Sequence, residues 1–390
     1  EHNVVELELA AGVLDATASG NRYETAEHTW NAWRESGVLL HDAAPAIYVL
    51  EQRFEHHGRE VSRRAFIVAV GLEPLDAGVI LPHERTLPKA LGDRFELIKA
   101  TGANFSQVFG LFDDPGCDTD GLFDVITATE PVATATDADG VKSTVWAHSD
   151  AGDALALAEF MEDRQIFIAD GHHRYTTALA YRDLMRKQAA QAGGHPADPP
   201  YDYVMMALVN MDDPDLAVLP YHRIANADGV FDAAAFRAGL ERHFDISELP
   251  DGHPSGALEG HDRPSFLIKT REDARPVLAV LRADVDPRTT ISAAQSDAWK
   301  SLDVAVLQEL VLWPLLGIHP DRAETLDRIS FTKDAHAAFR ATTDNDVAFV
   351  LRATRLDQLR SVSLAGETMP QKSTYFYPKL LSGLVFRDAR

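Results

Sequence analysis

The segment QIFIADGHHRYTTALAY, residues 165–181, constrains the local fold of this chain more than any other stretch. Its apolar beginning, which ends in Asp170, predicts a buried strand. Gly171 permits a tight turn, and a helix is expected from Tyr175 to about residue 190. The sequence therefore predicts a strand, a turn and a helix, with polar side chains gathered where the helix begins.

The start of that helix carries His172, His173 and Arg174. The helix dipole disfavours basic residues at this end, so three in succession require an explanation. The N–H groups of a helix N-terminus attract an anion, and arginine and histidine add charge and hydrogen-bond donors. Asp170 can hold a magnesium ion or orient a histidine. We favour a phosphate site over the alternative, an aspartate cap followed by a solvated basic turn.

The segment LPHERTLPK, residues 81–89, follows a short predicted strand. It places His83, Glu84 and Arg85 between two prolines. A carboxylate beside a histidine and an arginine can act as a general base. A surface loop with a chance cluster of charged residues explains the same sequence, and the residues alone leave both interpretations open.

Two other segments combine polar side chains with a glycine or a proline. In KATGANFS, Asn104 can bind a small polar ligand, although a helix end capped by Gly102 is slightly favoured. In LPYHR, His222 and Arg223 can form a second anion contact or mark a domain hinge.

The segment MPQKSTYFYPK, residues 369–379, is unusual in an arginine-rich chain because it holds two lysines. Lys372, Ser373 and Thr374 can bind a phosphate. The aromatic residues that follow can stack on a base or alternate into a core. We expect the tail to fold back onto the first domain, because an exposed tail would leave three aromatic side chains in water.

A length of 390 residues allows two or three domains, and strands and helices alternate along the chain, which predicts a mixed α and β class. We expect a phosphate-binding α+β domain over 1–225, a second α+β subdomain over 226–345 and a C-terminal segment, 346–390, that folds back onto the site. The supporting elements are helices at 22–37, 151–162, 231–244 and 302–316, and strands at 46–51, 65–72 and 203–211.

Charge and cysteine content exclude several function classes. A net charge of -23 argues against nucleic acid and anionic membrane as partners. Cys117 is the single cysteine, so neither an internal disulfide nor a multi-cysteine metal site can form. With no apolar run of ~20 residues and no signal-peptide pattern, we expect a cytoplasmic protein. A homodimer is the base-rate expectation.

Taken together, the motifs resemble the bacterial and archaeal family known as domain of unknown function ten-fifteen. The resemblance covers nearly the whole chain and rests on LPHERT, RFELIKATGANFSQVFGLFDDP, DGHHRY, LPYHR and MPQKSTYFYPKLLSGLV. Family members usually carry a further N-terminal stretch with a Pro-Pro-Tyr-Asp-Val motif. We do not find it here, so we expect that the chain is trimmed or lacks a piece that contributes to the site.

The strand–DGHHR–helix unit also resembles, more distantly, the ParB/sulfiredoxin-like superfamily and its archaeal free-serine kinases. This similarity implies an α+β fold with a mixed-sheet core. It further implies transfer of a phosphate from ATP, ADP or pyrophosphate, with Mg²⁺, to a small hydroxyl compound, L-serine giving O-phosphoserine.

The similarity implies roles for individual residues. Glu84 would take the hydroxyl proton, and Asp170 would hold magnesium or position the substrate, with His172 also in the catalytic set. The remaining expected contacts are to phosphate or nucleotide from Gly171, His173, Arg174, Tyr175, Lys372, Ser373 and Thr374, and to substrate from His83, Arg85, Asn104, His222 and Arg223.

Two alternatives come from other classes. One is a regulatory protein of ParB-like type that binds or hydrolyses a nucleotide. The other is a metal-dependent hydrolase that uses Asp170, His172 and His173 with His83 or His222. It is less favoured because adjacent residues rarely ligate the same metal.

Overall fold

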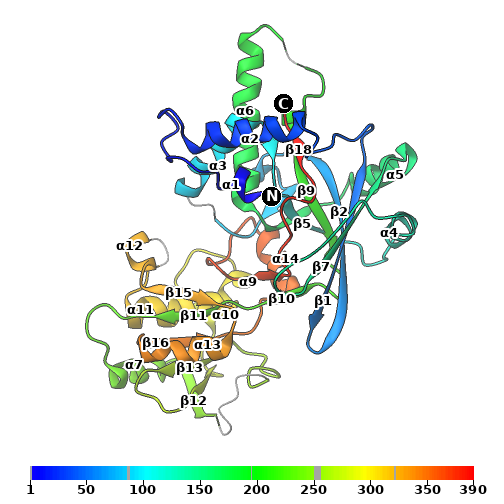
Figure 1. Cartoon of the computed structure of the whole chain (residues 1–390). Helices are drawn as coiled ribbons and strands as arrows, with labels where there is room; N and C mark the ends of the chain where they lie inside the picture. The colour runs from blue at the N-terminus through cyan, green and yellow to red at the C-terminus, as the bar shows by residue number, and fades with distance from the viewer. Residues whose placement is uncertain (1, 86–87, 195, 250–255, 320–321) are drawn as a thin grey trace. The chain divides into compact units, whose positions relative to one another are not determined.

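The computed structural model describes residues 2–85, 88–194, 196–249, 256–319 and 322–390. The chain forms two compact units, shown in Figure 1. Unit 1 comprises Glu1–Ala217 and Pro378–Arg390, and unit 2 comprises Val218–Tyr377. The C-terminal stretch 346–390 is thus divided between the units, with its last residues in unit 1.

Unit 1 is built on an eight-stranded mixed sheet with the order β3-β8-β5-β9-β2-β1-β7-β6. The pairs β3·β8 and β5·β9 are parallel, and the other neighbours are antiparallel. The strands are β1 (Ile47–His56), β2 (Arg59–Gly71), β3 (Ile80–Pro82), β5 (Val108–Phe112), β6 (Ala133–Thr136), β7 (Lys142–His148), β8 (Ile166–Asp170) and β9 (Tyr203–Asn210).

Helices bury the apolar side chains of this sheet. The helix α6 packs through Tyr175 and Ala178 against Ile168 of β8 and Met206 of β9. Helix α3 lies beside α6 and α2 lies beside α3 (Figure 1), and α2 and α3 share a second core around Trp30. The helices of unit 1 are α1 (Val5–Glu8), α2 (Arg22–Glu35), α3 (Pro88–Thr101), α4 (Asp120–Thr127), α5 (Ala151–Met161) and α6 (His172–Gln191), with 3-10 turns Leu75–Ala77 and Pro200–Asp202.

The last residues of the chain are anchored in unit 1. Strand β18 (Arg387–Asp388) pairs antiparallel with β4 (Ala103–Asn104). Arg387 also donates from Nη1 to the carbonyl of Tyr203 at 3.0 Å. Ala389 donates its N–H to Gly102 O at 2.7 Å and is buried. Hydrogen bonds and burial therefore hold this end of the chain in a defined place.

Unit 2 contains a six-stranded antiparallel sheet with the order β12-β14-β13-β16-β11-β15. Its strands are β11 (His222–Ala225), β12 (Phe244–Glu248), β13 (Ser265–Thr270), β14 (Val277–Leu281), β15 (Ile329–Thr332) and β16 (Val347–Val350), with β10 (Ala217–Leu219) and β17 (Tyr375–Tyr377) as a separate pair. Its helices are α7 (Ala233–Leu240), α8 (Pro287–Thr290), α9 (Asp297–Lys300), α10 (Asp303–Leu307), α11 (Trp313–Leu316), α12 (Ala323–Leu326), α13 (Ala335–Arg340) and α14 (Leu356–Leu364), with a π segment Gln308–Leu312 and a 3-10 turn Ala341–Thr343.

The expected α+β class is confirmed, as are the strand, the turn and the helix around Gly171. The helix begins earlier than expected, at His172 rather than Tyr175. Within the described ranges, no helix is long and apolar enough to cross a membrane.

Candidate functional site

The predicted turn lies where β8 ends and α6 begins. Gly171 has a left-handed φ of 90°, and no described side chain caps the helix that follows it. The side chain of Arg174 folds back over Gly171, so that a Cβ added to Gly171 would lie 2.8 Å from Arg174 Nε. The guanidinium therefore lies beside the N–H groups of the first helical turn, where a helix attracts anions.

Asp170 lies between two cations at the end of β8. Its Oδ2 accepts a hydrogen bond from Lys379 Nζ at 2.8 Å, and its Oδ1 lies 4.0 Å from Arg174 Nη2. The N–H of Gly171 donates to Oδ1 at 2.7 Å. Burial raises the pKa of Asp170, but the charges of Lys379 and Arg174 and these hydrogen bonds outweigh burial and lower the pKa to about 2. Asp170 is therefore ionised at neutral pH, and its side chain is 38% exposed.

Parallel pairing brings the segment with Glu84 to this turn. Strand β3 runs parallel to β8, with Pro82 opposite Ile168. The pairing ends at Pro82, and Glu84 follows two residues later, at a bend. Glu84 is half-buried, whereas Arg85 is exposed. The segment that carries Glu84 thus reaches the turn despite its long separation in sequence from Asp170.

Two buried histidines join the two segments. His83 Nδ1 lies 2.6 Å from Ile168 O, so Nδ1 carries the proton and donates it to that carbonyl. The N–H of His83 donates to His172 Nε2 at 3.2 Å, so this nitrogen of His172 accepts. Burial lowers the pKa of His83 to about 4 and lowers the pKa of His172 well below its ordinary value. Both rings are therefore neutral at pH 7, and Nε2 of His172 is engaged with backbone rather than open to a phosphate.

Other predicted contacts in unit 1 take structural roles. The Tyr175 hydroxyl donates to Glu73 O at 2.8 Å and accepts from Glu73 N at 3.0 Å, deep in the core. Asn104 Oδ1 accepts from Met205 N at 3.1 Å, which ties two strands together. His173 is half-buried beside Arg174. The structure thus gives Tyr175 and Asn104 backbone partners, and their contacts with a ligand stay predictions.

The remaining predicted residues belong to unit 2. His222 Nδ1 accepts from Leu351 N at 3.3 Å, and burial lowers its pKa to about 4. Arg223 is buried, which lowers its pKa to about 10, and it donates to the carbonyl of Tyr221 at 3.0 Å and to those of residues 371 and 372 at 3.4 Å. Ser373 and Thr374 are buried, whereas Lys372 is exposed with φ of 58°. These five residues therefore do not share a compact unit with the Gly171 turn.

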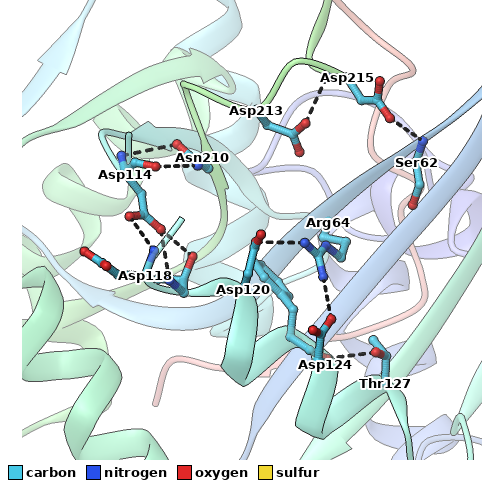
Figure 2. Close-up of polar contacts among 12 residues, drawn as sticks. Ser62, Arg64, Asp114, Asp118, Asp120, Asp124, Thr127, Asn210, Asp213 and Asp215 are labelled. Carbon is cyan, nitrogen blue, oxygen red and sulfur yellow. Dashed lines mark hydrogen bonds and ion pairs between the residues drawn. The ribbon is translucent and has the colours of Figure 1, made fainter. Parts of the chain in front are cut away.

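A group of aspartates elsewhere in unit 1 has a structural explanation (Figure 2). Asp114 is fully buried and accepts from Asp118 N at 2.9 Å and from Thr119 N and Oγ1 at 3.0 and 2.8 Å. Arg64 pairs with Asp120 at 2.8 Å and with Asp124 at 3.1 Å. Within the described ranges, no three His, Cys, Asp or Glu side chains are grouped so that they could hold a metal ion.

Sequence reasoning missed Lys379, which contacts Asp170, because it favoured Lys372 in the same motif. It also missed Arg63 and Gln52, whose side chains hold the backbone near Lys379. One signal was present: Arg63 occupies the inward phase of β2 between Val61 and Ala65, both buried. A charged residue in the buried phase of a strand indicates a specific partner.

Gly171→Ala is expected to weaken any anion binding at the turn and to destabilise the fold. An alanine at φ of 90° is strained by about 1–2 kcal/mol, and its Cβ would displace the Arg174 guanidinium. The matched control is Gly193→Ala, because Gly193 also has a positive φ, 83°, with nothing near its Cβ position. ATP affinity and urea unfolding should show a similar stability loss in both variants and an affinity loss only at Gly171. Equal ATP affinities in Gly171→Ala and Gly193→Ala would contradict the placement of the Arg174 guanidinium over Gly171.

Acidification from pH 6.5 to 4 is expected to destabilise the protein partly through His83. The unfolded chain takes up a proton near pH 6.5, whereas folded His83 does so only near pH 4, so the free energy of unfolding falls across this window. The difference corresponds to about 3 kcal/mol at most. Urea unfolding of the wild type and of His83→Asn, which keeps an N–H donor without titrating, should show a flatter pH profile for the variant. Parallel profiles would refute this origin.

Comparison with known proteins places the chain in a family. Residues 1–305 match the family model described as "Protein of unknown function (DUF1015)". The chain therefore belongs to this family, and the family expected from its motifs is confirmed. No curated protein matches the chain.

Several solved structures resemble the chain at low similarity. A free serine kinase in which one glutamate is replaced by alanine, in complex with ADP, is 12% identical with a TM-score of 0.38. The match covers 79% of this chain and 86% of that one. SbnI with a C-terminal truncation from Staphylococcus aureus is 11% identical with a TM-score of 0.38, covering 81% and 85%. A conserved hypothetical protein from Pyrococcus furiosus is 13% identical with a TM-score of 0.37, covering 81% and 93%. Likenesses at this level assign no activity, so the function is argued from the site.

Proposed function

We propose that this protein is a phosphotransferase that moves a phosphate from a nucleotide to a small hydroxyl compound, with free L-serine as the acceptor that the sequence resemblance implies. One observation carries the proposal: Arg174 is folded over the N-terminus of α6, with the ionised Asp170 directly before the turn. A guanidinium and N–H groups that face the same place form a phosphate site, and phosphoryl transfer depends mainly on positioning and charge.

The chain's residues have distinct tasks in this proposal. Arg174 and the first N–H groups of α6 bind the phosphates. The acceptor oxygen attacks the terminal phosphorus, Glu84 takes the hydroxyl proton, and the bond from phosphorus to the bridging oxygen breaks. ADP leaves with the electron pair of that bond when ATP is the donor. His83 and His172 are neutral and hold the two segments together, so the positive charge comes from Arg174 rather than from these two histidines.

The residues fit a magnesium ion that arrives with the nucleotide. Such an ion needs one or two protein carboxylates, with phosphate oxygens and water as its other ligands. Asp170 is ionised and accessible enough to hold it. When bound, the ion neutralises charge on the phosphates.

Isothermal titration of the purified chain with ATP, ADP and adenosine, each with magnesium, tests the proposal. The phosphate site predicts that ATP and ADP bind and that adenosine binds far more weakly. Equal affinity for adenosine and ATP would overturn it. Binding followed by release of inorganic phosphate without a phosphorylated acceptor would instead favour the regulatory, nucleotide-hydrolysing alternative.

A further inference from the structure

Arg63 is a buried cation that stability alone does not explain. Its side chain is 1% exposed, and burial lowers its pKa to about 9. The guanidinium lies 4.8 Å from the centre of the Phe109 ring. A buried charge carries a desolvation cost that an apolar residue at the same place would avoid. The groups that Arg63 contacts therefore indicate the role of this side chain.

Arg63 and Gln52 hold two successive carbonyl groups near the end of the chain. Arg63 Nη2 donates to the Pro378 carbonyl at 2.6 Å and also to Gln52 Oε1. Gln52 Nε2 donates to the Lys379 carbonyl at 3.1 Å. The two residues face each other across β1 and β2 and are both buried. We call this pair the carbonyl clamp.

The clamp fixes the backbone from which Lys379 reaches Asp170. Lysine has a long side chain that loses conformational freedom when it is held in one place. A fixed backbone restricts the positions that the ammonium can reach. Lys379 Nζ lies 2.8 Å from Asp170 Oδ2, and the Lys379 side chain is 40% exposed. The ammonium is therefore held at the turn, on a side chain that is partly exposed.

We infer that Lys379 is a phosphate-binding residue of the proposed site and that the carbonyl clamp positions it. The inference rests on the proposed function. Lys379 and Arg174 approach Asp170 from its two carboxylate oxygens, so a phosphate at the turn meets a cation on each side. Lysine supplies a point charge to phosphates in this way. Gln52 and Arg63 act through Lys379 and do not contact the phosphate themselves.

The test compares ATP affinity in Lys379→Met, Gln52→Glu and the double variant. Gln52→Glu keeps an acceptor for Arg63 but removes the donor to the Lys379 carbonyl, so it is a milder change than any replacement of Arg63. Lys379→Met is expected to weaken ATP and ADP binding roughly 10-fold, with adenosine unchanged. Gln52→Glu is expected to weaken ATP binding severalfold, and the double variant should bind no more weakly than Lys379→Met alone.

The matched control is Gln165→Glu, because Gln165 Nε2 also donates to a backbone carbonyl, that of Gly78, at 2.8 Å. It should leave ATP affinity unchanged, and circular dichroism should show that every variant is folded. Additive losses in the double variant would mean that Gln52 does not act through Lys379 and would overturn the inference. Wild-type affinity in Lys379→Met would also overturn it while leaving the proposed function intact. A wild type that binds neither ATP nor ADP would overturn both.

Discussion

Replacing Arg174 with alanine is expected to weaken ATP and ADP binding by roughly 10- to 100-fold while the protein stays folded. Hydrogen bonds from a charged donor contribute about 1.5–3 kcal/mol, and a tenfold change in affinity corresponds to about 1.4 kcal/mol. We expect the fold to tolerate the change, because the ion pair of Arg174 with Asp170 is long, at 4.0 Å. Titration calorimetry with ATP and urea unfolding measure the two effects separately.

The matched control for this prediction is Arg186→Ala. Arg186 lies on the same helix, and its Nη2 is 2.8 Å from the Asp202 carboxylate at the surface. It should change stability slightly and ATP affinity not at all. If Arg174→Ala unfolds the protein instead, Arg174 is structural and the phosphate site loses its principal cation.

Glu84→Gln is expected to lower turnover by about 10²- to 10⁴-fold with nearly unchanged nucleotide affinity. The amide matches the carboxylate in shape but cannot take the hydroxyl proton, and general-base catalysis contributes a factor of this size. Steady-state rates of acceptor phosphorylation and calorimetric ATP affinity, measured on the same preparation, separate the two effects.

Glu60→Gln is the control for Glu84→Gln, since Glu60 is an exposed carboxylate at the start of β2. It should leave both quantities at wild-type values. Retained turnover with lost nucleotide affinity in Glu84→Gln would contradict the base assignment, because it would make Glu84 a binding group.

Local sequence patterns predicted the strand, the turn and the helix that carry the site. They predicted less well the places where the backbone departs from a regular α-helix or β-strand. The apolar run before Asp170 and the glycine after it were sufficient for β8 and the turn. The helix expected at 302–316 contains a five-residue π segment, Gln308–Leu312. A π segment contains the same apolar residues as an α-helix, so hydrophobic periodicity alone cannot reveal the wider turn. Pro314 just beyond it has no N–H to donate to the helix.

The site itself was only partly predictable. Parallel pairing of β3 with β8 brings the segment that carries Glu84 to the turn, and such pairing is a property of the sheet rather than of either segment. Lys379 lies 209 residues from Asp170 in sequence. Nothing in the motif distinguishes Lys379 from Lys372 as the lysine that reaches the site. His172 was expected among the catalytic residues and His83 among the substrate contacts. The sequence does not show that backbone groups engage both rings and that burial keeps them neutral.

Phosphorus NMR of the protein with magnesium, ATP or ADP, and a pool of amino acids shows whether a phosphate reaches a small acceptor. We expect a new phosphomonoester signal that disappears when L-serine is omitted and is absent in Glu84→Gln. Release of free phosphate with no such signal would contradict transfer to serine and indicate a nucleotide hydrolase or switch. Unchanged spectra with every donor would contradict the phosphotransferase assignment altogether.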